Sequence, residues 1–170
     1  LGNGDRFGVK ITYMDEQQEL LGTGGGIFNA LSYLGEEPFW LINADVFSNY
    51  KINIKKTLVN DTSGHLILVP NPEHNSNGDF CLEKNIVKFK EGSKPYTYSG
   101  ISLLSAKLFE GCNKKILFQK SGIEENLLTY LLEKMAKEKL IKTNLNYWSL
   151  MDFSIGISKN DLKYKEIILD

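Results

Sequence analysis

The segment at residues 21–45 constrains the fold more than any other part of the sequence. It opens with a glycine run, GTGGG at residues 22–26. The apolar residues at 27–34 then recur at i, i+3, i+4 and i+7, which predicts a helix with one apolar face that ends at Gly35. The apolar run FWLI at 39–42 shows no alternation, so it predicts a strand buried on both faces.

This order of glycine-rich turn, helix and buried strand is typical of α/β proteins. We therefore expect a mixed, mainly parallel central sheet with helices on both faces, in a single domain over residues 1–170. Apolar patterns and turn residues elsewhere predict strands at 9–13, 65–69, 80–82, 86–89, 96–104 and just after 140, a loop at 70–79, and helices ending near 58, opening at 121 and lying at 162–167.

Composition excludes two classes of partner. The net charge is −1 and 24% of residues are charged, with no basic stripe, so nucleic acid is not expected as a partner. No apolar run approaches the roughly 18 residues of a membrane span. The two cysteines, Cys81 and Cys112, lack metal-like spacing, and free thiols in a reducing cytoplasm are expected.

The chain begins at Leu1 rather than Met, and residues 1–10 lack the pattern of a signal peptide. We interpret the sequence as lacking an N-terminal segment of the complete protein.

The turn at residues 23–26 is the first candidate site. Consecutive glycines let a ligand approach the backbone closely, and a helix N-terminus offers N–H groups without helical partners. A tight loop that merely requires positive φ is the structural alternative. The segment is not a P-loop, because GxxxxGK[ST] is absent.

Asp45 is the second candidate, because it follows the buried strand directly. Ligands of open α/β sheets bind at the carboxyl ends of strands, where a carboxylate is placed to hold Mg²⁺ beside a phosphate. The alternative role for Asp45 is to cap a following short helix.

The remaining candidate residues have weaker support for a functional role. The segment at residues 1–6 imitates a Gly-x-Gly-x-Arg phosphate loop but does not precede a helical pattern, so a surface turn is expected. His65 lies in an apolar strand and is expected in the core, whereas His74 lies in a loop without metal-spaced partners. No Ser-His-Asp or Cys-His arrangement is supported.

Taken in order, LGTGGG at 21–26, NADV at 43–46, NGDF at 77–80 and YSGIS at 98–102 resemble motifs of the sugar-1-phosphate nucleotidyltransferases. The resemblance extends from residue 1 to about 148. It is strongest to the N-acetylmuramate-1-phosphate uridylyltransferases of peptidoglycan recycling, with the mannose-1-phosphate guanylyltransferases nearby.

The resemblance implies a Rossmann-like, GT-A-like fold and a role for each motif. Base contacts would come from Thr23, Gly24 and Gly25, ribose and phosphate contacts from Asn43 and Ala44, sugar contacts from Asp79 and Gly100, and Mg²⁺ ligands from Asp45 and Asp152. Two departures stand out. The motif after Trp148 is stretched and lacks its Thr, and the family's N-terminal loop, with the Arg and Lys that grip the triphosphate, is missing from this sequence.

The implied reaction joins UTP or GTP to a sugar-1-phosphate, releases pyrophosphate and requires Mg²⁺, but no covalent protein intermediate. We expect the 170-residue chain to be nearly inactive by itself. Three alternatives remain: a mannose-1-phosphate guanylyltransferase, a GT-A glycosyltransferase, although these usually carry Asp-x-Asp, or a degenerate paralogue with a binding or regulatory role.

Overall fold

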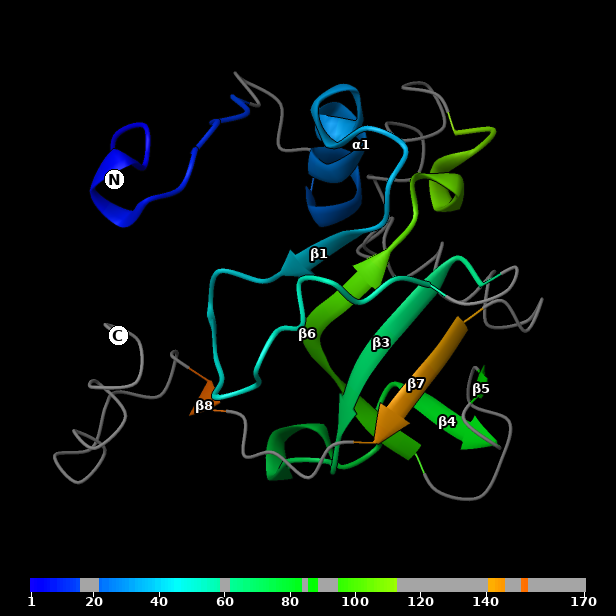
Figure 1. The fold of residues 1–170 in the computed structure, drawn as a ribbon. Coiled ribbons are helices and arrows are strands. Elements are labelled where there is room, and N and C mark those ends of the chain that lie inside the picture. Colours follow the sequence, from blue (N-terminus) through cyan, green and yellow to red (C-terminus); the bar gives the residue numbers. More distant parts are fainter. Residues whose placement is uncertain are drawn as a thin grey trace, which may run out of the picture.

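A computed structural model of the chain describes residues 1–15, 22–58, 62–83, 86–88, 95–112, 141–145 and 151–152. Within this part, one α-helix lies beside a six-stranded sheet of order β1-β6-β3-β7-β5-β4, and β2 pairs with β8 in a separate two-stranded sheet (Figure 1). The elements are η1 Asp5–Phe7, α1 Gly22–Leu34, β1 Phe39–Ile42, β2 Val46–Phe47, β3 Gly64–Val69, η2 Glu73–Asn75, β4 Phe80–Glu83, β5 Ile86–Lys88, β6 Pro95–Leu104, η3 Ala106–Phe109, β7 Ile141–Leu145 and β8 Met151–Asp152.

The strand directions differ from the expected mainly parallel sheet. Among the strands that the structure describes, only β3 and β7 pair in parallel, and every other pairing is antiparallel. The α/β class is confirmed, but the inference about direction was wrong. The expectation came from the apolar run at 39–42, and such a run indicates apolar surroundings without indicating the direction of the neighbouring strand.

Burial follows position in the sheet. Every residue of β3 is buried, because β6 and β7 flank this strand on either side. By contrast β1, predicted to be buried on both faces, is only half-buried, and Ile42 is 51% exposed. It is an edge strand among the described residues, with β6 as its partner.

The helix starts earlier than its apolar pattern indicates. It begins at Gly22, so the glycine run forms its first turn rather than a loop before it. The helix ends at Leu34 as predicted, and Gly35 follows with φ +73° while its amide donates to the Leu31 carbonyl over 3.1 Å. This is the left-handed C-terminal stop that glycine favours.

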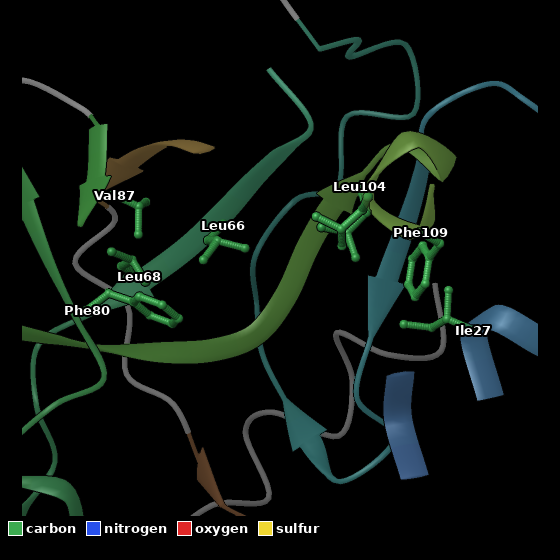
Figure 2. Packing of buried hydrophobic residues seen from close by; sticks show 8 residues of the cluster. Ile27, Leu66, Leu68, Phe80, Val87, Leu104 and Phe109 are labelled. Carbon is green, nitrogen blue, oxygen red and sulfur yellow. The ribbon is translucent and has the colours of Figure 1, made fainter. Parts of the chain in front are cut away.

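The hydrophobic core joins the helix to one face of the sheet. Figure 2 shows Ile27 of α1 near Phe109 and Leu104, with Leu66, Leu68, Phe80 and Val87 continuing the cluster along the sheet. Leu31 packs against the same cluster. Ile27 and Leu31 of the predicted apolar face thus contact the core, whereas Leu34, at the end of the helix, is 37% exposed.

The remaining predictions divide into three groups. The strands and loop over residues 64–104 and the strand after 140 are confirmed. The predicted strand at 9–13 and the helix ending near 58 were wrong, because 9–15 and 48–58 contain neither element. The helices expected from 121 and at 162–167 lie outside the described residues. No helix in the described part is long and apolar enough to cross a membrane.

The N-terminal residues form a turn of their own. Gly4 and Gly8 take left-handed conformations on either side of η1, and the Ile11 amide donates to the Asn3 carbonyl over 2.7 Å. The expected surface turn at residues 1–6 is confirmed, and no α-helix follows it directly.

Candidate functional site

The turn that leaves β1 carries three predicted site residues. The Asn43 amide donates to the Gly100 carbonyl over 2.9 Å, and the Val46 amide donates to the Asn43 carbonyl over 3.2 Å. The first bond ties the turn to β6, and the second closes residues 43–46 into a turn. Ala44 and Asp45 are exposed at the tip of the turn, and Asn43 is half-buried beneath them.

The Asp45 carboxylate is open to a ligand. Among the residues that the structure describes, it makes no hydrogen bond and no ion pair. The alternative role as a helix cap was wrong, because the next element is strand β2 and not a helix.

The backbone of Asp152 lies next to the turn that carries Asp45. Strand β8 pairs antiparallel with β2, and the Cα partner of Asp152 is Val46, the residue after Asp45. In Figure 1, β8 lies beside the loop that contains β2. The register thus brings together the two backbone segments whose acids were predicted to share a metal.

The residues at this turn fit Mg²⁺. Hard divalent cations prefer carboxylate and carbonyl oxygens, and Mg²⁺ at nucleotide sites is held by one or two protein carboxylates plus substrate phosphates. The exposed carboxylate at the strand end supplies one such ligand. Among the described residues, no group of three or more His, Cys, Asp or Glu side chains is placed to hold a metal ion, so a metal site made by protein ligands alone is not found there.

The glycine run forms the first turn of α1. Residues 35–38 connect the end of this helix to β1, the strand that leads into the turn at 43–46. Gly24 and Gly25 are buried, and Thr23 is half-buried. The first turn of a helix has amides without intrahelical acceptors, so the predicted amide donors fit this position. The positive-φ alternative was wrong, because these residues are helical.

Gly100 lies against the Asn43 turn, with φ +77°. A Cβ built there would lie 2.8 Å from Val46 Cγ2 and 3.1 Å from Asn43 Nδ2. A glycine inside a strand commonly marks a bulge or a close approach, and here the approaching group is the turn itself.

The Asp79 carboxylate, predicted on the sugar side, is engaged by the protein. Its two oxygens accept hydrogen bonds from Asn75 Nδ2 (3.0 Å) and from the Tyr98 amide (2.8 Å). Asn75 Nδ2 also donates to Thr97 Oγ1, which donates to Asn71 Oδ1 over 3.1 Å. These bonds fasten the loop at 70–79 to β6, two residues before Gly100.

Sequence reasoning missed a partner for His65. The imidazole is buried as predicted, and its Nε2 lies 2.7 Å from Lys56 Nζ. Burial, reinforced by the Lys56 charge, lowers the pKa of His65 to about 4, and burial also lowers the pKa of Lys56. An ammonium can only donate, so Nε2 accepts and His65 is neutral near pH 7. The sequence showed only a histidine in an apolar strand, which predicts burial of the side chain but does not identify Lys56 as its partner.

The loop at 48–58 is tied to β1 as well. Trp40 Nε1 donates to the Asn53 carbonyl over 3.3 Å, and the rings of Trp40 and Tyr50 lie 6.1 Å apart between centroids. This loop leads directly out of β2, so its attachments steady the strand that follows the Asp45 turn.

Solved structures give the fold. A protein described as a glucose-1-phosphate thymidylyltransferase from Bacillus anthracis, bound to sucrose, aligns with 99% of this chain and 69% of its own at a TM-score of 0.65 and 17% identity. A UDP-glucose pyrophosphorylase bound to UDP-glucose aligns with 93% of this chain and 65% of its own, at a TM-score of 0.55 and 18% identity. The chain therefore shares the Rossmann-like fold of these two solved structures.

Sequence comparison adds a particular relative. The N-acetylmuramate alpha-1-phosphate uridylyltransferase of Neisseria meningitidis serogroup B is 36% identical over 117 residues, which are 65% of this chain and 51% of the relative. The chain thus spans about half of that protein. No family model matches the sequence. The resemblance inferred from the motifs is confirmed by this relative and by the structural neighbours.

Proposed function

We propose that the complete protein is a sugar-1-phosphate nucleotidyltransferase. It transfers a nucleotidyl group from an NTP to a sugar-1-phosphate, giving an NDP-sugar and pyrophosphate. A phosphate oxygen of the sugar-1-phosphate attacks the α-phosphorus, and pyrophosphate leaves in line. Such chemistry needs positioning and charge neutralisation rather than a protein nucleophile, which agrees with the absence of a catalytic triad pattern.

The observation that carries this proposal is the turn at residues 43–46. An exposed carboxylate, without a protein partner among the described residues, lies at the carboxyl end of a strand and is held by two backbone hydrogen bonds. A charge-bearing side chain on a fixed backbone is what phosphoryl and nucleotidyl transfer require of a protein.

The chain's own residues divide the work in this proposal. Asp45 and Asp152 hold Mg²⁺, which when bound neutralises charge on the phosphates. The first-turn amides of Thr23, Gly24 and Gly25 orient the base, and Asn43 and Ala44 line the ribose and phosphate region. Gly100 and Asp79 lie on the sugar side.

For the substrates we propose UTP and N-acetylmuramate-1-phosphate, in a cytoplasmic cell-wall recycling step. The support is the relative that is 36% identical, which is an N-acetylmuramate alpha-1-phosphate uridylyltransferase. The free, buried thiol of Cys81 agrees with a reducing compartment.

The test is a substrate matrix with the full-length protein. UTP and GTP are each combined with N-acetylmuramate-1-phosphate and mannose-1-phosphate, and pyrophosphate release is measured. The proposal predicts the highest kcat/KM for UTP with N-acetylmuramate-1-phosphate. A preference for GTP with mannose-1-phosphate would favour the guanylyltransferase. NDP release from an NDP-sugar, without pyrophosphate formation from any pair, would favour a glycosyltransferase.

A further inference from the structure

Strand β6 changes register beside β3 at one place. Leu66 of β3 pairs with Ser102, whereas Leu68, two residues on, pairs with Tyr98. Four residues of β6 thus span the length of two in β3, and Gly100 lies at the centre of the excess with φ +77°. Extra residues of this kind bend a strand and turn its peptide groups away from the ladder.

The bulge is filled by the turn that carries Asp45. The Gly100 carbonyl accepts the Asn43 amide over 2.9 Å. The side chains of Val46 and Asn43 occupy the space where a side chain at position 100 would lie, at 2.8 Å and 3.1 Å from a built Cβ. One glycine therefore contacts both ends of the four-residue turn.

We propose that Gly100 is a positioning residue, which fixes the Asn43–Val46 turn and through it the Asp45 carboxylate. The consequence for metal binding rests on the proposed function; the contact itself does not. This role differs from the sugar contact that the resemblance implies for Gly100, because it acts through Asn43 and Val46 and not on the substrate.

The mechanism is steric as well as conformational. A methyl group at position 100 displaces Val46 or Asn43. These two residues are the ends of the turn that carries Asp45, so the displacement also moves the backbone of Asp45. Val46 is also the register partner of Asp152, so its displacement disturbs β2 and β8 together. Changes to groups that orient metal ligands typically weaken metal affinity about 10–100-fold.

The experiment compares Gly100→Ala with Gly111→Ala in the full-length protein. Gly111 has the same φ of +77°, but a Cβ there meets nothing within 4 Å, so the control carries the backbone strain without the contact. Amide hydrogen exchange at Asn43 is the first readout. We expect faster exchange in Gly100→Ala and wild-type exchange in Gly111→Ala.

Mn²⁺ binding in the presence of UTP, followed by electron paramagnetic resonance, is the second readout. We expect an affinity roughly 10–100-fold weaker in Gly100→Ala and unchanged in Gly111→Ala. Adding Val46→Ala to Gly100→Ala removes the nearest clash, and part of the affinity should return. If Gly100→Ala fails to fold, Val46→Ala alone serves, because it loosens the same contact without backbone strain.

Each outcome decides the proposal. Equal Asn43 exchange in wild type, Gly100→Ala and Val46→Ala overturns it. A raised KM for the sugar-1-phosphate in Gly100→Ala, with Asn43 exchange and Mn²⁺ affinity unchanged, also overturns it and favours a sugar contact. If the wild-type protein makes no NDP-sugar, the proposed function fails, whereas the Asn43 exchange still tests the positioning role.

Discussion

Two carboxylates singled out in the sequence have different surroundings in the structure. Asp45 is exposed and makes no hydrogen bond among the described residues, whereas both oxygens of Asp79 accept hydrogen bonds from the protein. Sequence motifs place an acid near a site but do not report its partners. The partners of Asp79 are Asn75 of its own loop and Tyr98 of β6, which is 19 residues away along the chain.

We predict that Asp79→Ala destabilises the protein by about 1–3 kcal/mol, because it leaves the Tyr98 amide without its acceptor. Urea denaturation measures this loss, and Glu73→Ala in the same loop is the control, since Glu73 is exposed. Unchanged stability together with a raised KM for the sugar-1-phosphate would show that Asp79 serves the substrate instead.

His65 gives a prediction for pH dependence. Its folded-state pKa of about 4 lies below the value of 6.5 for the free side chain, so the neutral form is favoured in the folded protein. The unfolded chain then binds more protons between these values. The free energy of unfolding should therefore fall as the pH drops from 6.5 toward 4, by up to about 3 kcal/mol.

The matched variants for this test are His65→Gln and His74→Gln. The His65 variant should lose most of the dependence between pH 6.5 and 4, and the exposed His74 variant should keep it, as read from urea melts at several pH values. An identical pH dependence in all three proteins would contradict the role of the Lys56–His65 contact.

The sequence predicted the bounds of helices and strands best where the apolar pattern and the turn residues point to the same boundary. The end of α1 at Gly35 and the strands from β3 to β6 follow directly from spacing and turn residues. The start of α1 could not be predicted in this way. Glycine disfavours a helix by about 1 kcal/mol relative to alanine, so the glycine-rich run at 22–26 predicts a loop. Burial of Gly24 and Gly25 shows that tertiary packing overrides this preference.

The core contact between α1 and the sheet can be tested at Leu104. This side chain is fully buried in the cluster that contains Ile27, Leu108 and Phe109. Leu104→Ala should cost about 2–5 kcal/mol of unfolding free energy, because it leaves a cavity in the core. Ile54→Ala removes a similar hydrocarbon volume at a position that is 84% exposed, and should cost little. Equal effects in the two variants would place Leu104 outside the core.

For the whole molecule, the sequence predicted the α/β class but not the directions of its strands. Direction depends on which distant strands pair, and β3 finds β6 and β7 more than 25 residues along the chain. Pairing between distant segments also determines which residues lie together at the candidate site. Neither the contact of Gly100 with Asn43 nor the register of Asp152 beside Val46 has a local signal.

Asp45→Asn in the full-length protein tests most directly the proposal that Asp45 holds the metal of a nucleotidyl transfer site. Because this side chain is exposed and makes no hydrogen bond among the described residues, the substitution should leave the thermal midpoint unchanged. Glu37→Gln, at another exposed acid, is the control. Pyrophosphate release from UTP and sugar-1-phosphate is measured across a Mg²⁺ titration. We predict a loss of at least about 100-fold in kcat/KM for Asp45→Asn alone; turnover and Mg²⁺ dependence equal to wild type would contradict the account.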